Sequence, residues 1–294
     1  QIGGKTTMGT IGSPGHDPSV ITVGASNMKI TPARGDDVVT NFSSRGPTRG
    51  ALVMSNGQRV TDNLLKPDLV APGNALVSAG STSVLGQWNQ LASKNAGLLS
   101  GLTGQVLNQT LMFLSGTSVS APVVSGAVAL MLQANPGLTP PLVKAILQYS
   151  AQPLPNASLV EQGAGMLNID GAVRLARALR TDIATQVANG TLTAGQAINA
   201  TALPVPVSTV GGVTFNWSRT VFVGGRHIAT GDALFTQYQP IWNPRTNWVG
   251  NQARQIGITW WPATLTVPAN AVARSFTETV APAGTLLTAG VRMG

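Results

Sequence analysis

The sequence predicts an α/β fold with a parallel sheet over residues 1–180, followed by a β-rich C-terminal extension. Two observations support this prediction. Up to residue 180, short β-branched segments alternate with segments of helical periodicity, which is typical of a parallel sheet covered by helices. The composition then changes, because residues 181–202 are small and polar and five of the six tryptophans follow them. We therefore expect a linker or a weak helix at 181–202 and an extension of unknown role at 203–294.

Three short runs predict buried strands in the first part of the chain. Residues 19–25 are mostly β-branched or small and follow a turn cluster rich in proline and glycine. Residues 40–44 form an extended piece that ends before a Gly-Pro pair, and residues 69–71 end before a Pro-Gly pair. Such bounded runs are typical of strands in a buried sheet.

Three segments predict helices. Apolar residues recur with helical spacing from Ser118 to Ala134. Because proline is tolerated only in the first turn of a helix, Pro122 requires this helix to start close to Ser118. Thr139 is expected to cap a second helix, whose first turn contains two prolines. A third helix is expected at residues 170–180.

The tryptophan-rich extension predicts further strands. Residues 214–217, 220–223 and 256–261 are β-branched or aromatic and lie between turns of Gly, Asn and Pro. The tryptophans concerned are Trp217, Trp242, Trp248, Trp260 and Trp261. Packing of these rings in a small β core is one interpretation. Binding of carbohydrate or of a partner is the alternative.

Composition excludes several classes of function. The net charge is +8, but the basic residues are dispersed and form no stripe, so no nucleic-acid partner is expected. The chain has no unbroken apolar run of about 18 residues, which argues against a membrane span. It has no cysteine, and its two histidines and scattered aspartates lack metal-ligand spacing, so no metal site or other cofactor is identified. The composition does not indicate an oligomeric state.

Ser118 stands where a helix is expected to begin, which suits a nucleophile. A serine hydroxyl attacks only when a base removes its proton and donors stabilise the oxyanion. The unpaired N–H groups and the dipole at a helix start provide such donors. Gly116 permits close approach of a substrate backbone, and Thr117 fills the turn. The alternative interpretation is an ordinary helix cap formed by the side chains of Ser115, Thr117 and Ser118.

Five segments resemble the subtilisin-like serine proteases, or subtilases. The segment Gly-Thr-Ser-Val-Ser-Ala-Pro, which begins at Gly116, resembles the serine motif of the family. It departs at Ser125, where the family usually has alanine or glycine. The other four segments follow the family order and lie at residues 10–25, 42–47, 66–73 and 162–168. The resemblance covers roughly residues 8–180.

The resemblance implies a subtilisin-like fold and a serine endopeptidase that cleaves protein or peptide substrates. Ser118 would attack the peptide carbonyl, and Gly12, Ser13, Gly116 and Thr117 would contact the substrate. An extracellular or cell-surface location is implied too, although no signal peptide is seen at Gln1. Structural calcium is also implied, without assignable ligands.

The catalytic aspartate and histidine of the family precede the serine by more residues than this chain offers. We therefore expect residues 1–180 to be the C-terminal part of a catalytic domain whose N-terminal half is missing. The family's oxyanion asparagine would lie at or before residue 1. An isolated chain of this kind should be inactive and should expose apolar edges.

Other candidate residues have simpler interpretations. His16 suits a surface turn, and His227 follows the serine in an order that the serine motif does not support. Asp68 is expected to bond loop amides beside the core, and Asn108 lies too close to the serine to be the oxyanion residue. A non-catalytic binding or surface protein that kept the subtilase scaffold is the alternative function.

Overall fold

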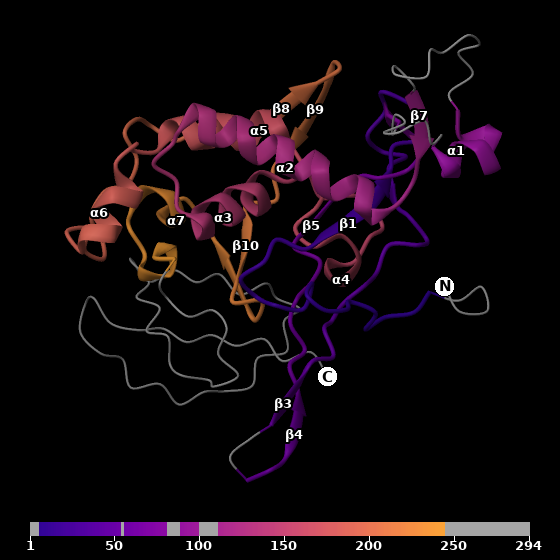
Figure 1. Ribbon diagram of the computed structural model, residues 1–294. Helices are drawn as coiled ribbons and strands as arrows, with labels where there is room; N and C mark the ends of the chain where they lie inside the picture. The colour runs from indigo at the N-terminus through magenta and orange to yellow at the C-terminus, as the bar shows by residue number, and fades with distance from the viewer. Residues whose placement is uncertain (1–5, 54–55, 81–88, 100–110, 245–294) are drawn as a thin grey trace.

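The computed structural model describes residues 6–53, 56–80, 89–99 and 111–244 (Figure 1). Three sequence predictions lie outside these residues: the strand at 256–261, the role of Asn108, and the packing of Trp248, Trp260 and Trp261.

The described residues form short strands and a set of longer helices. The strands are β1 (Val23–Asn27), β2 (Val38–Val39), β3 (Ala51–Val53), β4 (Arg59–Thr61), β5 (Leu69–Pro72), β6 (Leu76–Ala79), β7 (Leu111–Leu114), β8 (Val207–Val210), β9 (Val213–Asn216), β10 (Thr220–Val223) and β11 (His227–Thr230). The α-helices are α1 (Gln90–Lys94), α2 (Thr117–Ala134), α3 (Pro140–Ser150), α4 (Leu159–Gln162), α5 (Ile169–Ala178), α6 (Ile183–Asn189) and α7 (Ala233–Thr236). Two 3₁₀ turns complete the set: η1 (Ala96–Leu98) and η2 (Pro240–Trp242).

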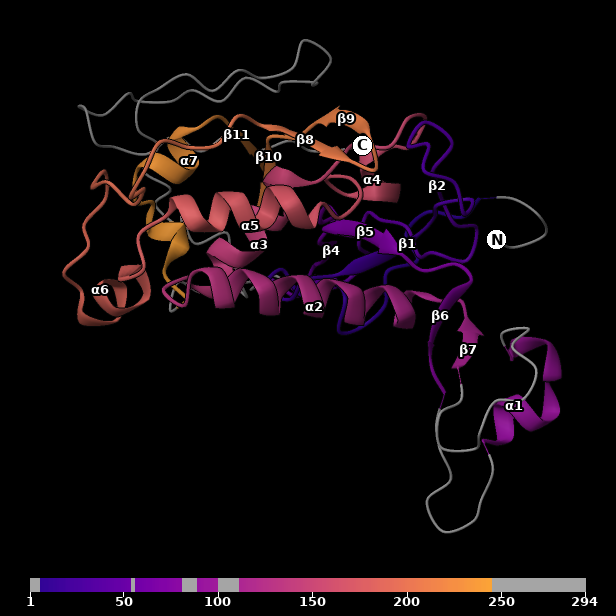
Figure 2. The same cartoon turned by 90° about the horizontal axis from the view of Figure 1, so that it is seen from above.

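A three-stranded sheet in the order β2-β1-β5 lies at the centre of the fold. β1 and β5 run parallel, with Val23 opposite Leu69 and Ser26 opposite Pro72. α2 covers one face of this sheet, and α4 lies on the opposite side (Figure 2). Helices therefore lie on both sides of a sheet that contains a parallel pair of strands, and the predicted α/β fold class is confirmed.

The predicted strand at residues 40–44 is wrong. The short strand β2 ends one residue earlier, and residues 41–43 form a turn in which the Ser43 N–H donates to the Thr40 carbonyl at 3.3 Å. The Ser43 hydroxyl then accepts the Ala25 N–H of β1 at 3.0 Å. A serine side chain thus replaces the carbonyl that a neighbouring strand would have offered to β1.

The three predicted helices are present, and each starts within one residue of its expected position. In α2, one row of side chains is buried against the sheet: Ser120, Val124, Ala127 and Met131. Side chains on the flanks of this row are exposed, such as Leu130 and Leu132 at 45% and 40% exposure. By length and composition alone, α2 is the one helix among the described residues that could cross a membrane, which is weak evidence because a core helix passes the same test.

The segment predicted as a linker or a weak helix contributes to the core. It contains α6, and the side chains of Ile183 and Ile198 have no exposed surface. Further along, Trp217 and Trp242 are 3% and 0% exposed and belong to the same apolar cluster as α2, α3 and α5. These two tryptophans therefore pack inside the fold. The domain boundaries at 180 and 202 stay a prediction.

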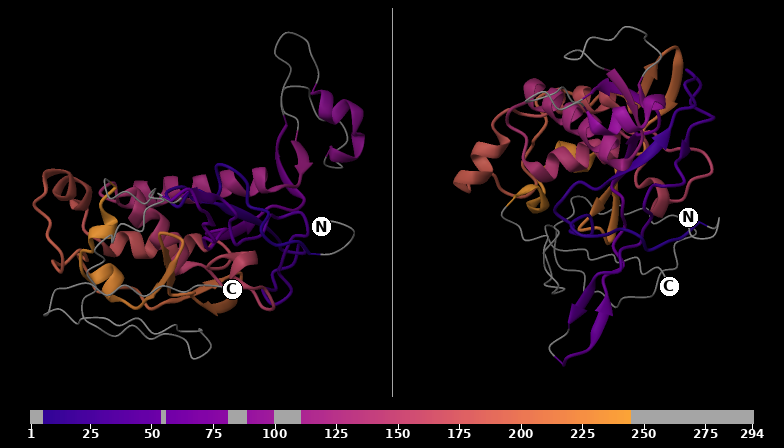
Figure 3. Two further views of the ribbon diagram at one scale, coloured as in Figure 1. Left: turned by 90° about the horizontal axis from the view of Figure 1, so that it is seen from below. Right: turned by 45° about the vertical axis from the view of Figure 1, so that its right-hand side comes forward.

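Two hairpins project from this body (Figure 3). β3 and β4 pair with each other in one arm. β6 and β7 pair in the other, which carries α1 at its outer end. The second arm matters for the site, because β7 leads directly into the segment that contains Ser118.

Candidate active site

Ser118 is the second residue of α2, and its side chain is exposed. The start of the helix is fixed to the carboxyl end of β5. The Gly116 N–H donates to the Gly73 carbonyl at 2.8 Å, and the Gly73 N–H donates to the Ser26 carbonyl of β1 at 3.0 Å. Ser118 therefore lies at the edge where the two parallel strands end, which is where ligands bind in open α/β sheets.

Backbone donors are available beside Ser118. The N–H groups of Val119 and Ser120 both donate to the Gly116 carbonyl, at 3.0 and 3.2 Å. In contrast, the N–H groups of Thr117 and Ser118 donate to no described residue. Gly116 has φ 154° and ψ 160°, a backbone conformation that essentially only glycine adopts. These free N–H groups could stabilise a negatively charged oxygen.

Ser120 holds the helix start against the sheet, a role that the sequence did not indicate. It is completely buried, and its hydroxyl donates to the Ala71 carbonyl of β5 at 3.1 Å. A Cβ atom at Gly73 would collide with this hydroxyl. Gly73 and Ser120 therefore set the close approach of α2 to β5, and with it the position of Ser118.

Ser118 has no base beside it among the described residues. Its hydroxyl makes no hydrogen bond to any of them. His16 lies in the turn before β1, and His227 begins β11. α3 and α5 lie between α2 and the hairpin of β10 and β11 (Figure 2). Neither histidine bonds to Ser118 in the described part of the chain.

The predicted substrate residues fall into two groups. Gly116 and Thr117 lie next to Ser118, whereas Gly12 and Ser13 lie in an exposed turn before β1. That turn is closed by the Asp17 N–H, which donates to the Pro14 carbonyl at 2.9 Å. Among the described residues, no hydrogen bond joins the turn to the start of α2. The role of Gly12 and Ser13 stays a prediction.

A buried charge cluster of Lys66, Asp68 and Lys144 anchors the segment between this turn and β1. The Asp68 carboxylate accepts from Lys66 Nζ at 2.7 Å and pairs with Lys144 Nζ at 3.0 Å. It also accepts the Thr22 N–H at 2.7 Å. Both lysines donate to the Val20 carbonyl at 2.9 Å. The expectation that Asp68 bonds loop amides beside the core is confirmed.

The sequence did not predict the two lysines of this charge cluster. Lys66 has no exposed surface and Lys144 has 7%. Lys144 lies in α3, far from Asp68 in the chain, so only the packing of α3 brings it to the carboxylate. Burial lowers the pKa of Lys66 to about 8, while the nearby Asp68 carboxylate opposes this shift.

The lowered pKa of Lys66 predicts that the free energy of unfolding rises with pH between about 8 and 10. In this window, Lys66 is largely deprotonated in the folded chain, whereas it keeps its proton in the unfolded chain, where its pKa is 10.5. Folding then releases a proton, and raising the pH should stabilise the fold by up to about 3 kcal/mol. Urea denaturation at several pH values tests this. Lys66→Met should flatten the slope, and an equal slope in this variant would contradict the assignment.

Comparisons with known proteins agree with the motif order along the chain. A sequence model of the subtilase family matches residues 3–168. The chain is 34% identical over 164 residues to the serine protease AprX of Bacillus subtilis, which covers 56% of this chain and 32% of that protein. It is 28% identical over 159 residues to the subtilisin-like protease SBT1.6 of Arabidopsis thaliana, covering 52% and 18% of the two chains. The chain thus spans about a third or less of the length of these relatives.

Solved structures of similar proteins include two proteases. Fervidolysin of Fervidobacterium pennivorans, a keratinolytic enzyme related to subtilisin, matches with a TM-score of 0.39 and 24% identity over 55% of this chain and 20% of that one. The CspB protease of Clostridium perfringens matches with a TM-score of 0.39 and 25% identity, over 57% and 28% of the two chains.

Proposed function

Because the chain belongs to the subtilase family, we propose that it carries the nucleophile of a serine endopeptidase, with Ser118 in that role. The observation that carries this proposal is the position of Ser118: exposed, in the first turn of α2, beside backbone N–H groups that have no partner among the described residues. In the proposed reaction, the Ser118 hydroxyl attacks the carbonyl of a peptide bond. The free N–H of Ser118 then donates to the oxyanion.

The base in this proposal comes from outside the 294 residues. The family resemblance implies a histidine that takes the Ser118 proton and an aspartate that orients this histidine. Neither His16 nor His227 bonds to Ser118. Without a base, the serine hydroxyl is a poor nucleophile. We therefore expect the 294-residue chain alone to be nearly inactive.

The substrate in this proposal is an extended polypeptide. An extended peptide commonly binds an enzyme by adding to an exposed edge of backbone. Gly116 and Thr117 would contact the substrate at the reacting bond, and Gly12 and Ser13 would border the pocket for a substrate side chain. An extracellular or cell-surface location is part of the same proposal and rests on the family resemblance alone.

Labelling with a fluorophosphonate probe tests the proposal. The 294-residue chain alone should not be labelled, whereas a longer polypeptide in which the histidine and the aspartate precede this chain should be labelled quickly. Ser118→Ala should abolish labelling of the longer polypeptide. Ser115→Ala is a matched control, because Ser115 is an exposed serine three residues away whose hydroxyl accepts the Ala75 N–H at 2.8 Å.

Two outcomes would contradict parts of this proposal. Rapid labelling of the chain alone would mean that a base is present within it. Absence of labelling in a folded longer polypeptide would instead support the alternative of a non-catalytic scaffold.

A further inference from the structure

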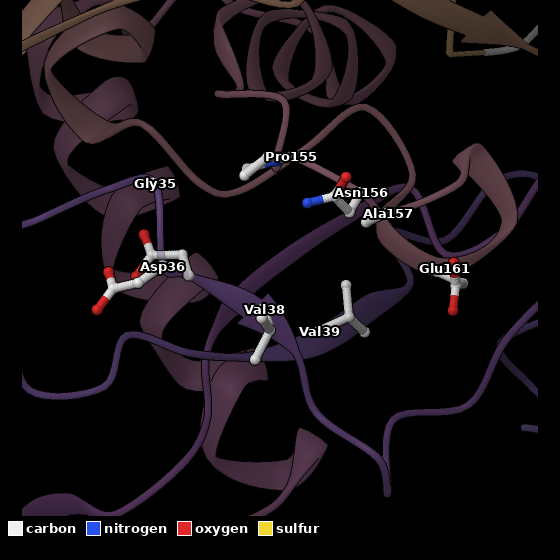
Figure 4. Close-up of a pocket in the computed structure, with 9 residues that line it drawn as sticks. Gly35, Asp36, Val38, Val39, Pro155, Asn156, Ala157 and Glu161 are labelled. Atoms are coloured by element: carbon white, nitrogen blue, oxygen red, sulfur yellow. The ribbon is translucent and has the colours of Figure 1, made fainter.

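A cavity of about 190 Å³ lies beside α4, between two loops (Figure 4). One loop, residues 35–37, leads into β2, and the other, residues 155–157, precedes α4. Four side chains give the cavity apolar walls: Val38, Val39, Pro155 and Ala157. The two valines lie across the cavity from Pro155 (Figure 4). Because an apolar cavity of about 150 Å³ can hold a six-carbon ring, this cavity is large enough for an aliphatic side chain.

Asp36 lies at one side of the cavity and is not paired with a basic side chain in the described part of the chain. Its carboxylate accepts the Thr31 hydroxyl at 3.1 and 3.0 Å. The guanidinium of Arg34 instead lies over an aromatic ring of β9, 5.4 Å from its centre. On the other side of the cavity, Glu161 is paired with Arg45 at 3.0 Å. The exposed negative charge of the cavity is therefore that of Asp36.

A strained turn next to this cavity carries an exposed apolar side chain. The Thr31 N–H donates to the Met28 carbonyl at 3.1 Å, which closes a tight turn around Lys29 and Ile30. These two residues have φ 54° and 59°. Turns with two positive φ values favour Asn and Gly, and a β-branched residue is strained there. Ile30 is nevertheless 88% exposed, so packing against the described residues offsets little of this strain.

The turn and the cavity belong to one connection, residues 28–37, between β1 and β2. Thr31 joins them, because its N–H closes the turn and its hydroxyl donates to Asp36. Ile30 is too exposed to occupy the cavity of its own chain. The turn also carries Lys29, which is exposed and forms no salt bridge with any described residue. One surface therefore presents an apolar projection with a positive charge beside an apolar cavity with a negative charge.

We propose that a second copy of this chain binds this surface and forms a two-fold symmetric dimer. In a two-fold interface both copies use the same surface, so each copy supplies one projection and one cavity. The Ile30 side chain of each copy enters the cavity of the other copy, beside Val38. The ammonium of Lys29 pairs with the partner's Asp36. The strained turn then has a function, because it holds the isoleucine away from its own chain.

The dimer should be weak and transient, because one side chain and one charge pair from each copy make a small interface. Burial of an isoleucine side chain contributes at least about a factor of ten in affinity, and the symmetry doubles the number of buried side chains. This association uses neither the Ser118 hydroxyl nor a catalytic base. Ser118→Ala should therefore leave the dimer intact, and the dimer and the proposed peptidase activity fail or succeed separately.

Sedimentation velocity of the 294-residue chain, at concentrations up to about 1 mM, tests this inference. We expect a monomer that converts to a dimer as the concentration rises. Ile30→Gly should weaken the dimer at least about a hundredfold. In dilute solution this variant should melt at an equal or higher temperature, because glycine adopts positive φ without strain. Leu132→Ala is the control, because it shortens an exposed apolar side chain on α2 and should leave the dimer intact.

Reversal of the two charges tests the pairing of Lys29 with Asp36. Lys29→Asp and Asp36→Lys, made separately, place like charges opposite each other in the dimer. Each should weaken the dimer by at least about tenfold. The double variant restores opposite charges and should recover most of the lost affinity.

Four results would overturn the inference. The first is a chain that stays monomeric at about 1 mM, and the second is an equal dimer affinity in Ile30→Gly. The third is an equal loss of affinity in Leu132→Ala, which would locate the association on α2. The fourth is a double charge variant that dimerises as weakly as the single variants.

Discussion

Asp68→Asn should lower the free energy of unfolding by about 3–5 kcal/mol, because it leaves two buried lysines without their carboxylate. Asp68 pairs with Lys66 Nζ at 2.7 Å and Lys144 Nζ at 3.0 Å, and all three side chains are less than 10% exposed. Gln148 Nε2 also donates to this carboxylate at 3.0 Å. An asparagine keeps the shape but cannot balance a buried positive charge.

Asp68→Asn should also loosen the segment that follows the predicted substrate turn of Gly12 and Ser13. Asp68 holds the Thr22 N–H, and Lys144 donates to the Pro18 and Val20 carbonyls at 2.8 and 2.9 Å. If the charge cluster opens, the segment that joins the turn of Gly12 and Ser13 to β1 loses its anchors. We therefore expect faster amide hydrogen exchange at residues 19–22 in this variant than in the unchanged chain.

Urea denaturation followed by circular dichroism measures the effect of Asp68→Asn. Asp182→Asn serves as the control, because its carboxylate is 47% exposed and pairs with Arg180 at the surface. Exposed pairs of this kind contribute about 0–1 kcal/mol. Equal losses in the two variants would show that the buried charge cluster has no special role in stability.

Trp242→Ala should lower the free energy of unfolding by about 3–5 kcal/mol, because the indole ring is completely buried. It stacks on Phe235 with the ring centres 6.2 Å apart, and its Nε1 donates to the Leu234 carbonyl at 3.1 Å. The Trp242 carbonyl accepts the Thr139 hydroxyl at 2.6 Å, just before α3. The loss should therefore destabilise the helices of the first 180 residues as well.

This variant also tests the predicted division of the chain. If residues 203–294 fold as an independent extension, Trp242→Ala should leave one unfolding transition unchanged. If they share the core of α3 and α5, a single transition should shift to lower urea. Val205→Ala is the control, since Val205 is 73% exposed and should change stability by less than about 0.5 kcal/mol. Amide exchange in α3 shows which result holds.

The sequence predicted the elements of the fold well wherever local chemistry decides. The apolar spacing predicted a helix from Ser118, and α2 begins at Thr117, but the expectation that Pro122 lies in the first turn is wrong, because Pro122 is inside the helix. The prolines after Thr139 likewise fixed the start of α3. The run at 220–223 forms β10 with the predicted bounds. The ordered motifs around Ser118 indicated the family to which the chain belongs.

Local chemistry also limited these predictions. The run at 40–44 looked extended, yet residues 41–43 form a turn, in which the Ser43 hydroxyl accepts the Ala25 N–H of β1. Residues 181–202 looked like a linker because they are small and polar, yet Ile183 and Ile198 reach the core. In each case, a contact with a distant segment outweighed the local pattern.

The sequence by itself determined the helix starts and the position of a serine at the head of a helix. These features depend on residues close together in the chain, through steric limits on proline and the spacing of apolar side chains. Only the tertiary structure decided that Lys144 of α3 meets Asp68, and that Asp37 is buried without a hydrogen-bond partner among the described residues. The charge balance of a buried group depends on which distant side chains the fold brings to it, and no local pattern records that.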